Sequence, residues 1–372
     1  MTVVTQILDR MGTIAKPQRK FLLSLFVTML VTRGRTNFLS LSRHSSWHAK
    51  TYRRQFQKEF SFVSFNQLSI DRAVPTQHTK LFAQDTTFST KSGQQTYGLD
   101  HFWNGTNSRA ERGLEVSLIS VLDVEANRCF ALSAEQTPPQ PAKKAEEKTN
   151  SRIDFYLAHL QRAAPDFPTN LCYGVVDGFY AKEKFVSGVC ALNYHLISRL
   201  RADARLLYLY EGAQKRRGRR RKYDGRVNFN ELSRFEKIAT SQAHITLYTL
   251  AVWSVSLRRQ VRVVAVVNSK EKDKLRHVVL FSTDTQLSAA DIFRFYKARF
   301  QIEFLFRDAK QFAGFSDCQA RDKEALPFHF NTSVSTVNLA RIMAQEEEKM
   351  EGQFVFSMAS IKQRFSMNIC ST

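Results

Sequence analysis

Short apolar segments separated by turns begin at Leu81, and their order constrains the fold more than any other feature of the chain. A helix that connects two strands indicates parallel pairing, whereas a short turn indicates a hairpin. Strands are predicted at 81–88, 114–124, 129–135, 171–176 and 194–200, helices at 153–164 and 180–186, and a hairpin turn at 125–128. The predicted fold class is therefore α/β, with a mixed sheet that begins antiparallel and continues through a helical crossover.

Residues 201–285 interrupt this order with further sequence that favours strands, so an inserted β-rich subdomain is expected. Its strands are predicted at 244–257 and 261–267. A long helix follows, with its cap predicted at Ser288 or Asp291 and its end near Phe312. A segment rich in Pro and Lys predicts a linker at 137–151.

The chain has 372 residues, of which 43% are hydrophobic, and a formal net charge of +21. That composition is sufficient to bury a core and excludes general disorder. Residues 1–60 carry a net charge of +9 and residues 201–226 carry +7, so two segments hold most of the excess. A basic excess favours a polyanionic partner such as nucleic acid. The run Lys215–Lys222 is interpreted either as a DNA contact or as a solvated loop.

Neither a membrane span nor a disulfide framework is predicted. The longest apolar stretch, 21–31, has 11 residues and falls short of the roughly 20 needed to cross a bilayer. Arginines follow it where a signal peptide would be cleaved, which favours a buried helix. The five cysteines are widely spaced and form no C-x-x-C pair, so no zinc site is predicted and a reducing interior, the cytoplasm, is expected.

The first basic segment is predicted to be helical. In order, the pattern predicts a helix at 21–31, a turn at 33–35, a helix at 38–43, an N-cap at Ser45 and a helix at 47–60. The last helix mixes aromatic residues with Arg53 and Arg54, as expected of a helix-turn-helix-like module that packs on one side and contacts DNA on the other. An amphipathic surface helix with solvated charges explains the same residues.

The long helix that ends near Phe312 has two polar stripes. At about 100° per residue, one stripe of about 60° contains four residues: Tyr296, Arg299, Glu303 and Lys310. The other stripe is the natural solvent face, and apolar side chains separate the two, so solvation does not explain the first. The first stripe indicates either a functional site or a buried salt-bridge ladder of Arg299 with Glu303.

The spacing Tyr296-x2-Arg299-x3-Glu303-x6-Lys310 resembles the YREK signature of bacterial insertion-sequence transposases of the DDE, ribonuclease H-like class. QDTTF around Asp85 resembles the first carboxylate motif of that family, and YGVVDGFYAKEKF around Asp177 resembles the second. The resemblance covers residues 20–345. It implies a ribonuclease H-like catalytic core, interrupted by the β-rich insertion and preceded by a helical DNA-binding domain. The expected domains are 1–70 (DNA-binding), 71–200 with 286–345 (catalytic core), 201–285 (insertion) and 346–372 (C-terminal tail).

Carboxylates suit the chemistry that the resemblance implies. Two divalent metals stabilise the attacking and leaving oxygens of an in-line displacement at phosphorus, and Mg²⁺ prefers carboxylate oxygens as ligands. By resemblance, three residues are both catalytic and metal-binding, with two Mg²⁺ ions expected and Mn²⁺ as a substitute: Asp85, Asp177 and Glu303.

The resemblance also implies the DNA contacts. Tyr296, Arg299 and Lys310 would contact phosphates beside the cut. Trp253 would stack a base flipped from the DNA end, with a core tryptophan as the alternative interpretation. Other acidic residues have simpler interpretations: Asp291 as a helix cap, Asp123 as a hairpin residue and Asp308 as a solvated surface charge.

The function implied is that of a cut-and-paste DNA transposase, which binds the terminal inverted repeats of its element and cleaves and transfers strands with Mg²⁺. Its expected partners are double-stranded DNA, both element ends and target, and a second copy of the chain in a paired-end complex. No membrane is involved, and association with the nucleoid is expected. A ribonuclease H-like DNA nuclease without strand transfer and a catalytically inactive DNA-binding remnant are the alternatives.

Overall fold

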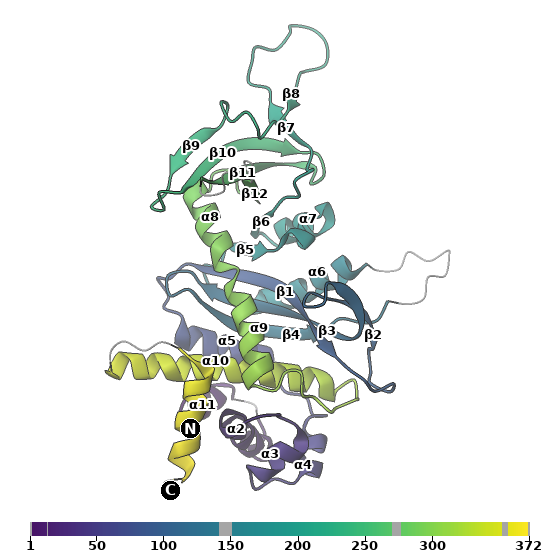
Figure 1. Cartoon of the computed structure of the whole chain (residues 1–372), viewed down its shortest axis with the longest axis vertical. Helices are drawn as coiled ribbons and strands as arrows, with labels where there is room; N and C mark the ends of the chain where they lie inside the picture. Colours follow the sequence, from purple (N-terminus) through teal and green to yellow (C-terminus); the bar gives the residue numbers. More distant parts are fainter. Residues whose placement is uncertain (1, 13, 141–150, 270–276, 352–355, 371–372) are drawn as a thin grey trace. The chain divides into compact units, whose positions relative to one another are not determined.

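The computed structural model describes residues 2–12, 14–140, 151–269, 277–351 and 356–370. The chain divides into two compact units. The first unit consists of Met1–Thr79, Gln84–Asn170 and Gln301–Thr372, and the second of Lys80–Ala83 and Leu171–Phe300. Both contain helices and strands, which confirms the predicted α/β class (Figure 1).

The helices of the first unit surround an aromatic core. The helix predicted at 21–31 lies within α2 and is buried, and the Phe26 ring stacks on Phe65 of α5 at 4.9 Å between centroids. Phe56 contacts Phe328 of α10 at 4.6 Å. The helices are α1 (Thr2–Arg10), α2 (Lys16–Val31), α3 (Phe38–Arg43), α4 (Ala49–Gln55), α5 (Phe62–Ala73), α6 (Arg152–Ala163), η1 (Ala164–Asp166), α9 (Gln301–Phe312), α10 (Ala325–Glu351) and α11 (Met358–Cys370).

The sheet of the first unit contains β1 (Lys80–Thr90), β2 (Asp100–Asn104), β3 (Arg109–Asp123) and β4 (Arg128–Gln136). Strand β3 pairs with β1, β2 and β4. The predicted hairpin is confirmed, because β3 and β4 pair antiparallel and Asp123 lies opposite Arg128. Strand β1 begins in the second unit with Lys80–Ala83 and continues in the first.

Strand β4 pairs only with β3 among the described strands, and α10 satisfies its other edge. The Asn331 side chain accepts the Ala134 N–H (3.0 Å) and donates to the Ala134 carbonyl (2.8 Å). Asn338 makes the same pair of bonds with Ala131, both 2.8 Å. Seven helical residues rise about 10.5 Å and three strand residues about 10 Å, so the two side chains meet the two backbone sites in register.

The second unit is built around a sheet in the order β5-β6-β12-β11-β10-β7-β8, with β9 beside β10. Strands β5 and β6 pair parallel across α7, which confirms the predicted crossover. Strand β12 pairs antiparallel with β6, so the β-rich segment continues the same sheet. The elements are β5 (Tyr173–Val176), η2 (Gly178–Tyr180), α7 (Glu183–Ala191), β6 (His195–Arg199), β7 (Leu206–Leu209), β8 (Tyr223–Arg226), β9 (Glu236–Ala239), β10 (Ile245–Ser254), β11 (Arg259–Asn268), β12 (His277–Ser282) and α8 (Ala289–Ala298).

The helix predicted at 47–60 is shorter in the structure. It spans Ala49–Gln55, and its N-cap is His48. Ser45 is therefore not the cap: its hydroxyl accepts the Trp47 N–H (3.2 Å) and the Tyr52 hydroxyl (2.8 Å) instead. Beyond Gln55 the chain turns, and Ser61 caps a separate helix, α5, by accepting the Ser64 N–H. The helix predicted at 180–186 likewise begins later, at Glu183, after the turn of η2.

Other predictions concern linkers, membranes and thiols. Of the predicted linker at 137–151, residues 141–150 lie outside the described part of the chain. No described helix is long and apolar enough to cross a bilayer. The cysteines whose side chains are described are free thiols: Cys129, Cys172, Cys190 and Cys318.

Two buried histidines make the stability of the first unit depend on pH. Burial lowers the pKa of His159, which contacts the hydroxyls of Ser117 (3.0 Å) and Ser133 (2.9 Å), to about 4. Burial also lowers the pKa of His329, whose Nε2 donates to the Gly314 carbonyl (2.9 Å), to about 4. Between pH 6.5 and 4 the unfolded chain binds protons that the folded chain does not, so the free energy of unfolding falls as the pH is lowered through that window. For each histidine, the free energy of unfolding falls by on the order of 1 kcal/mol for every unit by which its folded pKa lies below its unfolded pKa.

Urea unfolding at a series of pH values measures this loss. His159→Gln with His329→Gln should flatten the pH dependence between 6.5 and 4, whereas the exposed control His101→Gln should leave the slope unchanged. Equal slopes in all three proteins would contradict the prediction.

Candidate active site and nucleic-acid interface

Asp85 lies in the part of β1 that belongs to the first unit. Its neighbour Gln84 is buried, and the amide of Gln84 donates to the Ser117 hydroxyl (3.2 Å) and the Tyr156 carbonyl (2.9 Å). Successive strand residues face opposite ways, so Asp85 faces the other side of the sheet. There it is half-buried, and its Oδ1 accepts the Thr86 N–H (2.8 Å). The predicted strand position of Asp85 is confirmed.

Glu303 and Lys310 share one face of α9 in the first unit. Glu303 is in the first turn, and Lys310 is seven residues later, which is close to two full turns. Both side chains are half-buried, and burial lowers the pKa of Lys310. The N-terminal end of a helix favours a carboxylate charge such as that of Glu303.

Asp308 was predicted to be a solvated surface charge, and that prediction is wrong. Its side chain is 4% exposed and is paired with Arg307 (3.0 Å) and with the buried Arg341 of α10 (3.3 Å). Arg341 also donates to the Cys129 carbonyl of β4. Helical periodicity placed Asp308 on the outer face of α9, but α10 covers that face and carries the complementary charge. The pair ties the helix that carries Glu303 to α10 and β4.

Replacing Asp308 by Asn should destabilise the first unit by about 3–5 kcal/mol, because the buried Arg341 guanidinium loses its counter-charge. The matched control is Arg307→Gln, which removes the exposed partner and should cost at most about 1 kcal/mol. Urea unfolding compares the two midpoints. Similar shifts in both variants would exclude a structural role for the buried pair.

The helix predicted as continuous to Phe312 breaks at Arg299 and Phe300. The Arg299 N–H donates to the Tyr296 carbonyl (3.3 Å) and the Phe300 N–H to the Lys297 carbonyl (3.2 Å), which are i to i−3 bonds. Helix α8 thus ends in the second unit and α9 begins in the first. The prediction of one continuous helix is therefore wrong, and the shared stripe of Tyr296, Arg299, Glu303 and Lys310 stays a prediction.

Of the two predicted caps of α8, Ser288 is confirmed, and the interpretation of Asp291 as the cap is wrong. Its hydroxyl oxygen accepts the Asp291 N–H (3.0 Å), and its hydroxyl donates to the Asp291 carboxylate (2.7 Å). Asp291 is thus a first-turn residue that supports the cap and is itself paired with Arg294 (3.2 Å).

In the second unit, Asp177 directly follows β5 and caps η2. Its Oδ1 accepts the Phe179 N–H (2.8 Å), and its carbonyl accepts the Ser198 hydroxyl (2.8 Å). Burial raises the pKa of the Tyr296 hydroxyl; the charge of Arg299 lowers it and that of Asp177 raises it further. The Arg299 guanidinium lies 5.7 Å from the Tyr296 ring centroid. Within this unit, Asp177 and Arg299 therefore both lie within electrostatic reach of the Tyr296 hydroxyl.

Arg199 was not predicted as a site residue. It is the exposed last residue of β6, and its charge also lowers the pKa of Tyr296. Parallel pairing of β5 with β6 brings the ends of the two strands to one sheet edge, so Arg199 and Asp177 emerge together. The available sequence signal was its position at the end of the strand that follows the crossover.

Three predicted DNA-binding residues, Arg53, Arg54 and Trp253, lie in environments that fit a DNA contact and also fit the alternative interpretation of each residue. Arg53 and Arg54 are exposed on α4, next to the buried Tyr52, as in either interpretation of that helix. Trp253 on β10 is partly exposed, and its ring lies 5.7 Å from the Tyr223 ring of β8. This environment fits both base stacking and packing of the tryptophan in its strand.

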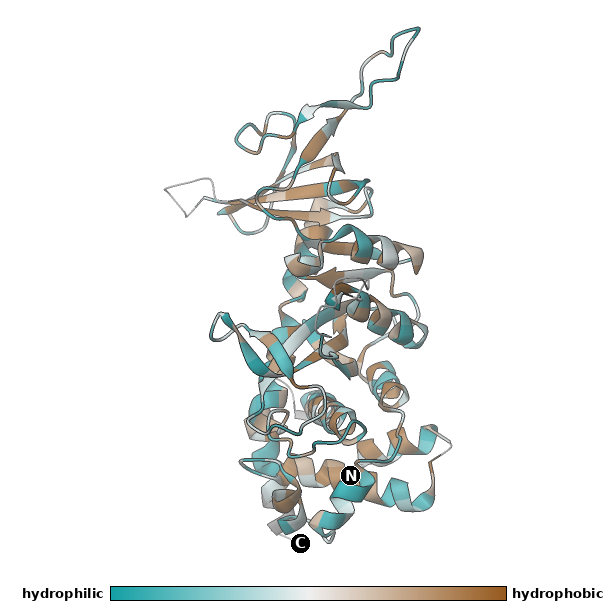
Figure 2. Ribbon diagram, turned by 90° about the vertical axis from the view of Figure 1, so that its right-hand side faces the viewer, coloured by the Kyte–Doolittle hydropathy of each residue, from teal (hydrophilic) through white to brown (hydrophobic). Residues whose placement is uncertain are grey.

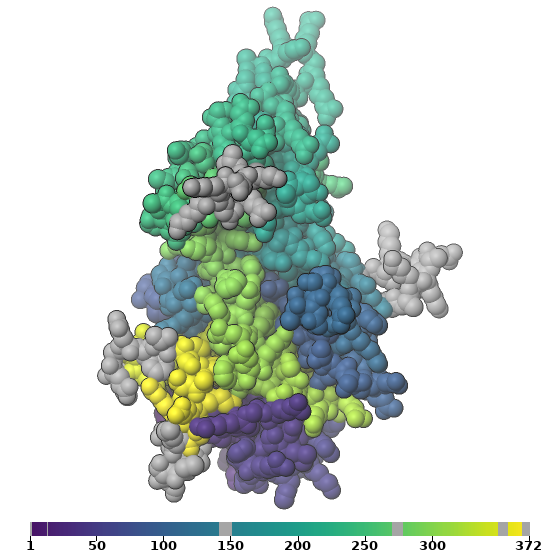
Figure 3. Space-filling model, viewed as in Figure 1, coloured from purple at the N-terminus to yellow at the C-terminus, as the bar shows by residue number. Residues whose placement is uncertain are grey.

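The basic run Lys215–Lys222 forms an exposed loop between β7 and β8. The loop is hydrophilic along its length (Figure 2, top) and stands clear of the strands that carry it (Figure 3, top). Arg221 lies over the Tyr210 ring at 4.6 Å and pairs with Asp224 at 2.5 Å, which holds the base of the loop.

His78, Asp123 and Glu125 form a group that has the side chains of a metal site. Their atoms already have hydrogen-bond partners in the β3–β4 hairpin. His78 Nδ1 lies 2.9 Å from both Asp123 oxygens, and Asp123 also accepts the Ala126 N–H (3.0 Å). Glu125 accepts the N–H and hydroxyl of Thr79 (2.7 and 2.8 Å). The group is accounted for as the hairpin contact predicted for Asp123.

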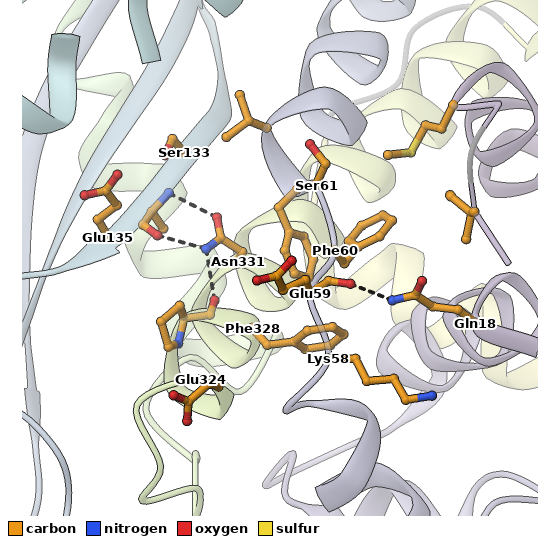
Figure 4. A pocket seen from close by; sticks show the side chains of 16 residues that line it. Gln18, Lys58, Glu59, Phe60, Ser61, Ser133, Glu135, Glu324, Phe328 and Asn331 are labelled. Carbon is orange, nitrogen blue, oxygen red and sulfur yellow. Dashed lines mark hydrogen bonds between the residues drawn. The ribbon is translucent and has the colours of Figure 1, made fainter. Parts of the chain in front are cut away.

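A cavity of about 620 Å³ lies within the first unit, between the N-terminal helices, the end of β4 and the start of α10 (Figure 4). Its lining includes the rings of Phe60 and Phe328, and Asn331 crosses it to the backbone of β4. Gln18 donates to the Glu59 carbonyl (2.7 Å) at the opposite wall. None of the predicted catalytic residues lines this cavity.

Comparison with known proteins identifies a family that this chain matches. A family model described as "DDE superfamily endonuclease" matches residues 11–262, which include Asp85 and Asp177 and end before Glu303. No curated protein matches the chain. A solved structure similar to it is the piggyBac transposase synaptic complex with hairpin DNA, at 9% identity and a TM-score of 0.47, covering 96% of this chain and 72% of that one. The family model matches more than half of this chain, so the chain belongs to the DDE superfamily endonucleases.

Proposed function

We propose that this chain is a DNA transposase that cleaves the ends of a mobile element and joins them to target DNA. The observation that carries the proposal is the grouping of Asp177, Tyr296 and Arg299 in the second unit. Family membership supports phosphodiester cleavage, and the family match includes Asp85 and Asp177. The YREK-like spacing and the origin from an insertion sequence belong to the same proposal.

The proposed metal ligands are Asp85, Asp177 and Glu303. All three carboxylates are half-buried: Asp85 lies within β1, Asp177 follows β5 and Glu303 is in the first turn of α9. Their hard oxygens fit divalent Mg²⁺ or Mn²⁺. When bound, the metals would activate the attacking oxygen and stabilise the leaving one. Asp177 is held rigidly for this role, because the Phe179 N–H and the Ser198 hydroxyl fix its side chain and its carbonyl.

The proposed phosphate contacts are Tyr296, Arg299 and Lys310. A tyrosine hydroxyl is protonated at neutral pH, and burial raises the pKa of Tyr296 further, so the hydroxyl would donate a hydrogen bond to a phosphate oxygen. Arg299 remains charged and offers a planar set of donors. Burial makes the charge on Lys310 costly, and an adjacent phosphate would offset that cost.

The remaining assignments extend the proposal along the chain. Residues 1–70, with Arg53 and Arg54, would bind the terminal inverted repeats, and residues 71–200 with 286–345 would form a ribonuclease H-like core. Residues 201–285 would form the insertion in which Trp253 stacks a base, and 346–372 a C-terminal tail. The active assembly would be a homodimer on paired DNA ends, at the nucleoid.

A DNA nuclease without strand transfer is the second candidate, because the family description names an endonuclease and no joining activity. Incubation of the protein with Mg²⁺, an element end and a supercoiled target distinguishes the two. Covalent joining of the 3′ end to the target supports the transposase, and hydrolysis without joining supports the nuclease. Binding without either product would leave an inactive DNA-binding protein.

Asp177→Asn should reduce Mg²⁺-dependent cleavage more than about 100-fold, because even the outer partners of metal ligands are worth 10- to 100-fold. Binding to the DNA end should persist, since the DNA contacts are separate residues. Cleavage of a labelled end and fluorescence anisotropy measure the two effects. The control Asp291→Asn removes an exposed carboxylate of the same unit that pairs with Arg294 and should retain cleavage. Full activity of Asp177→Asn would exclude Asp177 as a ligand.

Replacing the five arginines of 216–221 by Gln should weaken DNA binding and flatten its salt dependence. Each arginine that contacts a phosphate contributes about 0.9 to the slope of log K against log salt. The control is Arg201→Gln, an exposed arginine of the same unit whose charge is offset by Asp203 at 3.0 Å. A slope unchanged from that of the wild type would identify the run as a solvated loop.

A further inference from the structure

The hairpin of β2 and β3 has two chemically different faces. Strands β2 and β3 pair antiparallel, with His101 opposite Arg112, Phe102 opposite Glu111 and Trp103 opposite Ala110. Side chains alternate between faces in a strand, so Phe102 and Glu111 share one face and the other pairs share the second. We call these the inner face and the outer face of the hairpin.

The inner face holds the acidic residues of the hairpin, each with a cationic neighbour. Phe102 is fully buried, and the Arg152 guanidinium of α6 covers its ring at 4.6 Å. Asp100 lies 3.9 Å from Arg152. Glu111 accepts hydrogen bonds from Asn104 (2.6 Å) and Arg109 (2.7 Å). Both carboxylates are thus paired on the inner face.

The outer face combines an exposed aromatic ring with cationic or titratable nitrogen groups. Trp103 is 59% exposed, the largest exposed fraction among the described large hydrophobic side chains. His101, Ala110 and Arg112 are exposed beside it. No carboxylate is present on this face of the paired residues 100–104 and 109–113. Arg152 also donates to the His101 carbonyl (2.9 Å), so α6 supports the strand from behind.

We propose that the outer face of this hairpin binds single-stranded DNA, with the Trp103 indole stacked on an unpaired base and Arg112 and His101 at the adjacent phosphates. An exposed indole stacks on any base, and neighbouring cations follow the backbone. The absence of acidic side chains from this face removes the repulsion that a phosphate would otherwise meet. The inference rests on the proposed function only in taking DNA as the substrate; it adds a surface that none of the predicted contacts includes.

A single-tryptophan chain tests the proposal directly. The sequence has three tryptophans, so Trp47→Phe with Trp253→Phe leaves Trp103 as the only indole. Titration with a 12-nucleotide oligothymidylate in EDTA should quench its fluorescence, and a blunt duplex of the same length should quench it less. In the otherwise unmodified full-length chain, Trp103→Ala should weaken oligothymidylate binding about 5- to 150-fold, and Trp103→Phe should restore part of it.

The hairpin supplies its own matched control for charge. Arg112→Gln and Arg109→Gln each remove one exposed arginine, but Arg109 is turned to the inner face and paired with Glu111 at 2.7 Å. Only Arg112→Gln should reduce the affinity for oligothymidylate and the salt dependence of that binding. Equal effects, or no quenching of Trp103 by the oligonucleotide, would overturn the proposal. Quenching that instead follows protein concentration without DNA would identify a contact between copies and would also overturn it.

The binding assay and the cleavage assay test the hairpin surface and the proposed function separately. If cleavage depends on Asp177 but DNA does not quench the Trp103 fluorescence, the proposed function stands and the hairpin surface is excluded. If DNA quenches the Trp103 fluorescence but the wild-type chain does not cleave DNA, the hairpin surface stands and the proposed enzymatic function is excluded.

Discussion

The hydrogen bonds between asparagine side chains and the edge of β4 are the contact on which the arrangement of the first unit depends. A buried backbone group without a partner costs about 1–3 kcal/mol, and an edge strand exposes several. Asn331 and Asn338 satisfy Ala134 and Ala131, and the Asn66 side chain joins the network by accepting from Asn338 at 3.1 Å. The long helix α10 is thereby held in one register along the sheet.

That register determines where α9 lies. Arg341 is three residues beyond Asn338 on α10, and it reaches both the Cys129 carbonyl of β4 and Asp308 of α9. A buried ion pair contributes little net stability compared with an apolar contact, but it disfavours arrangements that leave either charge alone. In this chain the arrangement it selects is the one that orients the face of α9 carrying Glu303 and Lys310.

Strand positions were predictable because apolar alternation and turns are local signals. They located the strand of Asp85, the strand that precedes Asp177 and the hairpin at Asp123. The break after α8 was not predictable, since Arg299 and Phe300 include neither Gly nor Pro and continue the helical pattern. The burial of Asp308 was missed for a related reason: periodicity defines a polar face but does not reveal that α10 covers it and pairs it with Arg341, 33 residues later.

By itself, the sequence determined the order of strands and helices, the two basic segments and the types of residue available for chemistry, because each depends on neighbours within a few positions. Only the tertiary structure decided which polar groups are buried and which charges face each other. Those outcomes depend on pairs far apart in the chain, such as Asn66 with Asn338, separated by 272 residues. No local period records such a contact, because it exists only once the helices and the sheet have packed together.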